Sequence, residues 1–242
     1  MNPPVRTLRA VMIDLDGTLL DTAPDLAFAA NRVRGEFGLP ELAVDRIAQF
    51  VGKGTDILVH RALQDDMDAR VDEERFQRAK HSFERHYSEV NGRHARVFTR
   101  VPEALAALRQ AGLALACVTN KPRAFTHPLL ESKELMSCLD AVVAGDEVAR
   151  RKPHPDLLWE ACARLGVEPI DAMLIGDSQN DAQAAAAAGS ASVLVETGYN
   201  EGEPVQELAG SQGVQGIFPT LFDAAQWLIG QVARARGEQA RP

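Results

Sequence analysis

The sequence predicts an α/β protein, with a Rossmann-like, doubly wound parallel sheet as its core and an inserted all-helical domain. Two observations lead to this fold class. In the second half of the 242-residue chain, short apolar runs of strand length alternate with helical patterns, as in a parallel sheet covered by helices on both faces. Near the N-terminus stands one more apolar run, and only helical patterns separate it from the alternating part.

The predicted strands are apolar at nearly every position, which is typical of strands buried on both faces. They are residues 10–14, 113–119, 141–144, 172–176 and 192–196, and a sixth is expected near residues 216–218. Helices are predicted at 102–112, after Pro122, and at 155–165, 180–188 and 221–233. Residues 234–242 are expected to form a frayed tail.

The inserted domain is predicted from an interval that lacks strands. From residue 24 to about residue 90 the pattern is helical and is broken at glycines such as Gly38, Gly52 and Gly54. The expected division is therefore an α/β core of residues 1–20 and 97–242, with a helical domain of residues 21–96.

Composition excludes several classes of protein. A formal net charge of −8 argues against a nucleic-acid surface, which requires a basic stripe. The apolar run at residues 8–13 is too short to span a bilayer, and Asp14 and Asp16 follow it closely, so we expect no signal peptide and a cytoplasmic protein. Cys117, Cys138 and Cys162 form no CxxC pair and are interpreted as reduced packing residues.

Polar residues gather where the predicted strands end. In a parallel sheet these carboxyl ends share one edge, and ligands bind there at the point where strand order reverses. The residues at this edge are Asp14, Asp16 and Thr18 after the first strand, Thr119 and Asn120 at the second, Lys152 before the fourth, and Asp177, Ser178 and Asp181 after it.

Several carboxylates in one dry cleft repel each other and raise each other's pKa unless a cation is present. Mg²⁺ accepts oxygen ligands in octahedral geometry and prefers one or two carboxylates with waters and substrate phosphate. The predicted ligands are the side chains of Asp14 and Asp177 and the backbone carbonyl of Asp16. Thr119 and Asn120 would then donate to phosphate oxygens, and Thr18 is also expected to bind substrate.

Each of these signals has an ordinary structural explanation when taken alone. An Asp-x-Asp at a strand end is more often a turn or a cap than a metal site, and Lys152 alone would be a surface charge. Thr119 and Asp177 could simply start helices. The functional interpretation is favoured because all four signals fall at the same edge of one sheet.

The order and spacing of these motifs resemble the haloacid dehalogenase-like hydrolase superfamily. The resemblance implies that Asp14 attacks phosphorus, that Asp16 protonates the leaving oxygen and then activates water, and that Lys152 steadies the nucleophile. Asp181 and Ser178 would support the site. An aspartate at position 16 favours a phosphatase or phosphomutase, because members that displace halide need no acid there.

Longer stretches are similar to bacterial phosphoglycolate phosphatases: DLDGTLLDTAPD at 14–25, FVGKG at 50–54, TNKP at 119–122, KPHP at 152–155 and GYNEG at 198–202. This similarity implies that the helical domain is a C1 cap, and that Lys53 and the amide of Gly54 contact a small carboxylate such as that of glycolate. A plain loop with an exposed lysine is the alternative for Lys53. Thr99 and Arg100 stand where relatives often carry Pro-Gly.

The expected reaction is Mg²⁺-dependent hydrolysis of a small-molecule phosphate, most simply 2-phosphoglycolate, by a monomer or homodimer without nucleic-acid or membrane partners. Alternatives on the same machinery are a sugar phosphate, pyrophosphate or N-acetylmuramate 6-phosphate as substrate. More distant alternatives are a phosphomutase, a phosphonoacetaldehyde hydrolase with a Schiff base on Lys53, and a non-catalytic binding module. The low aromatic content, 5%, disfavours a nucleotidase.

Overall fold

A six-stranded parallel sheet forms the centre of the molecule, and the computed structural model of the chain describes residues 8–239. Its strands are β1 (Ala10–Ile13), β4 (Ala114–Val118), β5 (Ala141–Val143), β6 (Ala172–Gly176), β7 (Ala191–Val195) and β8 (Val214–Phe218). The spatial order is β5-β4-β1-β6-β7-β8. In chain order of these six strands this is 3-2-1-4-5-6, the doubly wound order, so strand order reverses between β1 and β6. The predicted fold class and all six predicted strands are confirmed.

Helices cover both faces of this sheet, because both faces are apolar. The core helices are α5 (Val101–Gln110), α6 (Arg123–Ser132), α7 (Asp156–Leu165), α8 (Gln179–Ala188) and α9 (Leu221–Gln239). In β1, Val11 and Ile13 pack in a cluster with α5 and α9, whereas Ala10 and Met12 pack with α7 and α8. This alternation follows from the two-residue period of a strand. Single-turn helices η1 (Met136–Cys138), η2 (Pro169–Asp171), η3 (Asn200–Gly202) and η4 (Val205–Leu208) occupy connections.

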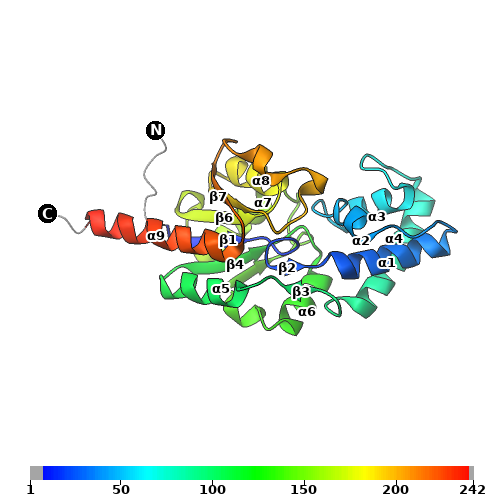
Figure 1. Cartoon of the computed structure of the whole chain (residues 1–242), viewed down its shortest axis with the longest axis horizontal. Coiled ribbons are helices and arrows are strands. Elements are labelled where there is room, and N and C mark those ends of the chain that lie inside the picture. Colours follow the sequence, from blue (N-terminus) through cyan, green and yellow to red (C-terminus); the bar gives the residue numbers. More distant parts are fainter. Residues whose placement is uncertain (1–7, 240–242) are drawn as a thin grey trace.

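Four further helices stand apart from the sheet at one end of the molecule (Figure 1). They are α1 (Ala23–Glu36), α2 (Val44–Ala48), α3 (Thr55–Gln64) and α4 (Glu73–Val90). They enclose a separate apolar cluster that includes Phe50, Phe83 and Tyr87. The chain enters and leaves this group of helices through a short antiparallel pair, β2 (Leu20–Asp21) and β3 (Arg96–Val97). This pair was not predicted, because strands of two residues are too short to show a periodic pattern.

The C-terminal expectation was partly wrong. Helix α9 continues to Gln239, so residues 234–239 are helical and not a frayed tail, while residues 240–242 lie outside the described part. Alanine and arginine are strong helix formers, and the glycine at position 237 costs only about 1 kcal/mol without ending the helix. Among residues 8–239, no helix is long and apolar enough to cross a membrane.

Arg100 adopts a backbone conformation that glycine favours. Its φ is 63°, in the left-handed region. Its guanidinium carbon lies 3.3 Å from the centroid of the Phe222 ring in α9. This cation–π contact helps to offset a backbone strain of about 1–2 kcal/mol. The chain therefore keeps the turn before α5 without a glycine.

Asp25 in α1 holds the segment through which the chain returns from the four helices to the sheet. Its fully buried carboxylate accepts hydrogen bonds from the backbone amides of Gly92 at 2.9 Å, His94 at 2.9 Å and Ala95 at 3.0 Å. We expect Asp25→Ala to lower the free energy of unfolding by about 3 kcal/mol, because three buried amides lose a charged acceptor. Urea denaturation measures this change.

The matched control is Asp45→Ala, which removes an exposed aspartate in the first turn of α2. It should change the free energy of unfolding by less than about 0.5 kcal/mol. A loss below about 1 kcal/mol in Asp25→Ala would show that water replaces the carboxylate at these amides.

Candidate active site

Two aspartates stand on either side of the point where strand order reverses. Asp14 follows β1 and Asp177 follows β6, and these strands are paired neighbours with Ile13 opposite Ile175. Both side chains are buried, Asp14 at 8% and Asp177 at 3% exposure. The sheet therefore brings together carboxylates that lie 163 positions apart in the sequence, as the carboxyl-end argument predicts.

Lys152 joins two of the buried carboxylates. Its Nζ lies 2.8 Å from Oδ1 of Asp14 and 2.7 Å from Oδ1 of Asp181, and it donates to the carbonyl of Val118 at 3.0 Å. Burial opposes the charge on this lysine, but Asp14 and Asp181 raise the Lys152 pKa above its ordinary value. Lys152 is therefore a fixed cation beside Asp14, and not a surface charge.

Asp177 is oriented by two neighbours. The Thr18 hydroxyl donates to Oδ1 at 3.1 Å, and the backbone amide of Tyr199 donates to Oδ2 at 2.9 Å. The loop carrying Tyr199 can approach this closely because residue 198 is glycine: a Cβ there would lie 2.0 Å from Asp177 Oδ2. Thr18, predicted to bind substrate, thus supports Asp177 in this structure.

Asp181 and Ser178 are held in a helix cap. Asp181 Oδ2 accepts from the Ser178 hydroxyl at 2.6 Å and from the Ser178 amide at 3.2 Å, which forms the capping box of α8. With Lys152 on its other oxygen, Asp181 has both oxygens engaged. The supporting role expected for Asp181 and Ser178 stays a prediction.

The acidic residues Asp14, Asp177 and Asp181 form a group that could hold a metal ion. One carboxylate oxygen from each lies within 4.8 Å of the others. Burial, with the charges of Asp181 and Asp177, raises the pKa of Asp14 well above its usual value, although Lys152 opposes the shift. Burial and the charge of Asp181 likewise raise the pKa of Asp177 to about 7. The raised pKa values of Asp14 and Asp177 therefore reflect burial together with repulsion between neighbouring carboxylates.

A charge count makes the same point. Asp16 adds a fourth carboxylate to this edge, and Lys121 adds a second ammonium beside Lys152. If all six groups are ionised, four negative and two positive charges leave an excess of two. A hard divalent cation on oxygen ligands fits both this excess and the donor set.

Asp16 points to a different partner from Asp14, although only two residues separate them. Its Oδ1 accepts from Lys121 Nζ at 2.9 Å and from the Thr22 hydroxyl at 2.6 Å, and its Oδ2 lies 3.2 Å from Lys121 Nζ. Its side chain is therefore not in the group formed around Asp14. Only its backbone carbonyl was predicted to bind metal, and this arrangement leaves that possibility intact.

The side chains of Thr119 and Asn120 are less available to a substrate than predicted. Asn120 donates its amide to the carbonyls of Gly52 at 2.8 Å and Lys152 at 2.9 Å, and its Oδ1 accepts from the Lys152 amide at 2.8 Å. Both N–H donors of the side chain are thus engaged. The Thr119 hydroxyl accepts from the backbone amide of Lys121 at 3.2 Å and still has a proton to donate.

A cavity between the sheet edge and helices α1 and α3 contains this chemistry. About 40 Å³ of it is open to the centres of water molecules. Its lining residues are Asp14, Asp16, Leu26, Val51, Gly52, Gly54, Thr55, Leu58, Thr119, Asn120, Lys121, Asp177, Ser178, Tyr199 and Asn200. Asp14 and Asp177 therefore line the same cavity.

Lys53 does not line this cavity, although its neighbour Gly54 does. The Lys53 ammonium lies 2.7 Å from Oε2 of Glu201, and Arg61 lies 2.6 Å from Oε1 of the same carboxylate. The lysine predicted to contact a substrate carboxylate is therefore paired with a carboxylate of the protein.

Sequence reasoning missed Lys121 and Tyr199. Lys121 is buried, at 5% exposure, and lies two residues after Thr119 within the TNKP stretch. Tyr199 lies in the GYNEG stretch, and its hydroxyl is in hydrogen-bond range of the amides of Thr22 and Ala23 and of Asp21 Oδ1. Both residues stood inside quoted motifs, but only the tertiary structure shows which carboxylate each one contacts.

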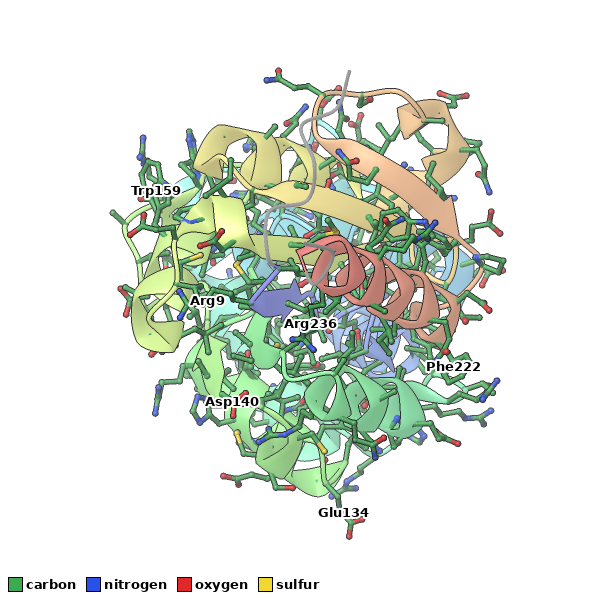
Figure 2. The ribbon with its side chains drawn as sticks, turned by 90° about the vertical axis from the view of Figure 1, so that its left-hand side faces the viewer. Arg9, Glu134, Asp140, Trp159, Phe222 and Arg236 are labelled. Carbon is green, nitrogen blue, oxygen red and sulfur yellow. The ribbon has the colours of Figure 1, made fainter. Side chains whose placement is uncertain are left out.

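A larger surface hollow lies at the opposite edge of the sheet, beside Arg9 and Arg236, which Figure 2 labels. Its volume is about 280 Å³, and its other lining residues are apolar or glycine: Leu8, Gly112, Ala114, Leu165, Val167, Val232 and Ala235. Among the described residues that line it, the two arginines are the only ones with a polar side chain. Size alone therefore does not identify the reactive site.

Comparison with known proteins agrees with the geometry. Residues 11–195 match the haloacid dehalogenase-like hydrolase family. A phosphoglycolate phosphatase of Nitrosospira multiformis is 48% identical over 219 residues, covering 90% of this chain and 95% of the relative. A plasmid-encoded phosphoglycolate phosphatase of Cupriavidus necator is 47% identical over 191 residues, covering 78% of this chain and 81% of the relative.

Solved structures give the same result. The crystal structure of a predicted phosphoglycolate phosphatase from Haemophilus somnus superimposes with a TM-score of 0.82 at 31% identity, covering 91% of this chain and 98% of that chain. CbbY from Rhodobacter sphaeroides, solved with phosphate, shares the fold with a TM-score of 0.72 at 20% identity, covering 90% of this chain and 96% of that chain. The chain belongs to the haloacid dehalogenase-like hydrolases, and its curated relatives are phosphatases of that family.

The raised pKa of Asp177 predicts how stability depends on pH in the metal-free protein. The ordinary value is 3.8 and the folded value is about 7. Between these values the folded protein keeps a proton that the unfolded chain releases, so the free energy of unfolding falls as pH rises from about 4 to about 7. Urea denaturation in EDTA at pH 5 and pH 7.5 measures the slope.

Asp177→Asn is the matched variant, because an amide cannot ionise. Its stability should fall less over the same interval, and the remaining slope should reflect Asp14. An identical slope in both proteins would show that Asp177 does not carry the shift.

Proposed function

We propose that the chain is a Mg²⁺-dependent phosphatase that hydrolyses 2-phosphoglycolate to glycolate and phosphate through an aspartyl phosphate on Asp14. The proposal rests on one observation: Asp14 and Asp16 line the same cavity but contact different partners. Asp14 lies beside Lys152 and Asp177, which suits a nucleophile, whereas Asp16 lies apart from this group on the side of Lys121, a separate position from which it would exchange protons with the leaving group and with water.

In the first step, a carboxylate oxygen of Asp14 forms a bond to phosphorus as the bond between phosphorus and the ester oxygen breaks. Asp16 gives its proton to that oxygen, so glycolate leaves as an alcohol. In the second step, Asp16 takes a proton from a water that attacks the phosphoryl group, which frees Asp14 and releases phosphate. Lys152 holds positive charge beside Asp14 throughout.

Mg²⁺ bound to the carboxylates of Asp14 and Asp177, with the carbonyl of Asp16, would neutralise charge on the transferring phosphoryl group. The residues of the chain perform the other tasks. Thr119 donates to a phosphate oxygen, and Thr18 and Tyr199 keep Asp177 in place. The nine-tenths burial of Asp14 and Asp177 keeps water from screening these charges.

We further propose that residues 21–96 act as a cap over the site. Leu26, Gly52 and Leu58 from this part line the cavity together with Asp14. The Asn120 amide holds the carbonyl of Gly52 at 2.8 Å, a contact that must break if the cap moves away. Closure of this kind excludes water from the acyl phosphate.

The substrate assignment rests on the small cavity and on the names of the relatives. The narrow cavity suits a two-carbon acid phosphate better than a bulkier hexose phosphate. Tyr199 is the single aromatic residue among the described residues that line the cavity, which gives no stacking platform for a base. Lys53, engaged by Glu201, is a poor candidate for Schiff-base chemistry.

The test of mechanism uses Asp14→Asn and Asp16→Asn. Asp14→Asn should reduce turnover to background, because an amide does not attack phosphorus. Asp16→Asn should lower kcat/KM for 2-phosphoglycolate by about 10²–10⁴-fold, and for p-nitrophenyl phosphate by clearly less, because p-nitrophenolate leaves without a proton. Phosphate release measures both.

The control is Asp223→Asn, an aspartate in the first turn of α9, which should keep wild-type turnover. Turnover should also stop in EDTA and return with Mg²⁺. A wild-type rate in Asp14→Asn, or full activity without metal, contradicts the mechanism.

The substrate is tested with a panel of phosphates. The specificity constant for 2-phosphoglycolate should exceed those for hexose phosphates, pyrophosphate and N-acetylmuramate 6-phosphate by at least about 10-fold, because only the small acid fits the closed cavity. Preference for a bulky sugar phosphate would overturn the substrate while leaving the role of Asp14 unchanged.

A further inference from the structure

We propose that Lys121 is the residue that selects substrates with a carboxylate on the leaving group. The proposal rests on the proposed phosphoglycolate phosphatase function and assigns its specificity to a residue of the core instead of to Lys53 in the loop before α3.

The position of Lys121 places its charge on the leaving-group side of the cavity. Its Nζ lies 2.9 Å and 3.2 Å from the two carboxylate oxygens of Asp16, the residue that would protonate the ester oxygen. In 2-phosphoglycolate the carboxylate carbon is two bonds from that oxygen. A group beside Asp16 is therefore also beside the carboxylate, whatever the rotation of the short leaving group.

Lys121 retains donor capacity for a ligand. An ammonium has three N–H groups, and Asp16 accepts two hydrogen bonds from this one. The Tyr87 ring of α4, with its centroid 4.9 Å from Nζ, covers another side and adds a cation–π contact. Burial opposes the charge on Lys121, whereas Asp16 and Tyr87 raise the pKa of this lysine above its ordinary value.

The other cations near the site are engaged elsewhere. Lys152 lies between Asp14 and Asp181, on the nucleophile side. Lys53 pairs with Glu201 at 2.7 Å. Arg151 donates to the carbonyl of Gly145 at 3.2 Å and lies 3.7 Å from Asp56.

None of these three basic residues lines the cavity, whereas Lys121 does, and it is the single basic residue among the described lining residues. A leaving group with a negative charge gains a buried ion pair there, and a neutral one does not. Because the site is desolvated, this difference is larger than it would be at the surface.

The experiment compares two substrates that differ only in the recognised group. They are 2-phosphoglycolate and 2-hydroxyethyl phosphate, in which a hydroxymethyl group replaces the carboxylate. The quantity measured is the ratio of their kcat/KM values in the wild type, Lys121→Met and Lys53→Met. Any effect of Lys121 on the proton donor Asp16 acts on both substrates and largely cancels in the ratio.

We expect the wild type to favour 2-phosphoglycolate and Lys121→Met to lower that ratio by at least about 30-fold, which corresponds to about 2 kcal/mol. Lys53→Met should keep the ratio within about 3-fold. Glycolate, tested as a competitive inhibitor, should bind more weakly to Lys121→Met by a similar factor. This second measurement needs no turnover and applies even if the variant is catalytically slow.

Each contrary outcome has its own meaning. A wild-type preference that survives in Lys121→Met overturns the role of Lys121 and leaves the proposed function standing. If the ratio falls in Lys53→Met instead, the substrate carboxylate is recognised by the loop before α3, and the proposed role of Lys121 is wrong. A wild type with no preference between the two substrates rejects the phosphoglycolate assignment itself, and the specificity role with it.

Discussion

The structure depends on one electrostatic constraint: carboxylates buried at the reversal point of a parallel sheet must have cations beside them. Lys152 meets part of that need by bridging Asp14 and Asp181, and Lys121 meets another part at Asp16. Burial and the charges of neighbouring carboxylates together raise the pKa of Asp14 and Asp177. In the proposed function, a divalent cation would relieve this repulsion and would present positive charge to a phosphate.

The loop after β7 connects this charge cluster to the helical part of the chain. The Tyr199 amide holds Asp177, while its hydroxyl reaches the amides of Thr22 and Ala23, where the chain enters α1. Two residues on, Glu201 pairs with Lys53 and Arg61 from the helical part. The same short segment thus orients a candidate metal ligand and attaches the helices that close the cavity.

Separating Asp14 from Asp16 is what allows two identical side chains to have different tasks. The turn after β1 directs one toward Lys152 and the other toward Lys121 and Thr22. In the proposed mechanism the first exchanges a phosphoryl group and the second exchanges a proton. The different lysine partners of Asp14 and Asp16, and not a difference in residue type, set these proposed roles.

The sequence by itself determined the sheet, its helices and the residues at its carboxyl edge, because local apolar period and strand-end position fix those features. It could not show that the Asn120 side-chain amide donates to the carbonyls of Gly52 and Lys152. Nor could it show that Lys53 pairs with Glu201 or that Lys121 contacts Asp16. Those partners lie 32 to 148 residues apart along the chain. Only the packing of the helices against the sheet decides which distant charges meet, since a side chain's partner depends on three-dimensional proximity and desolvation.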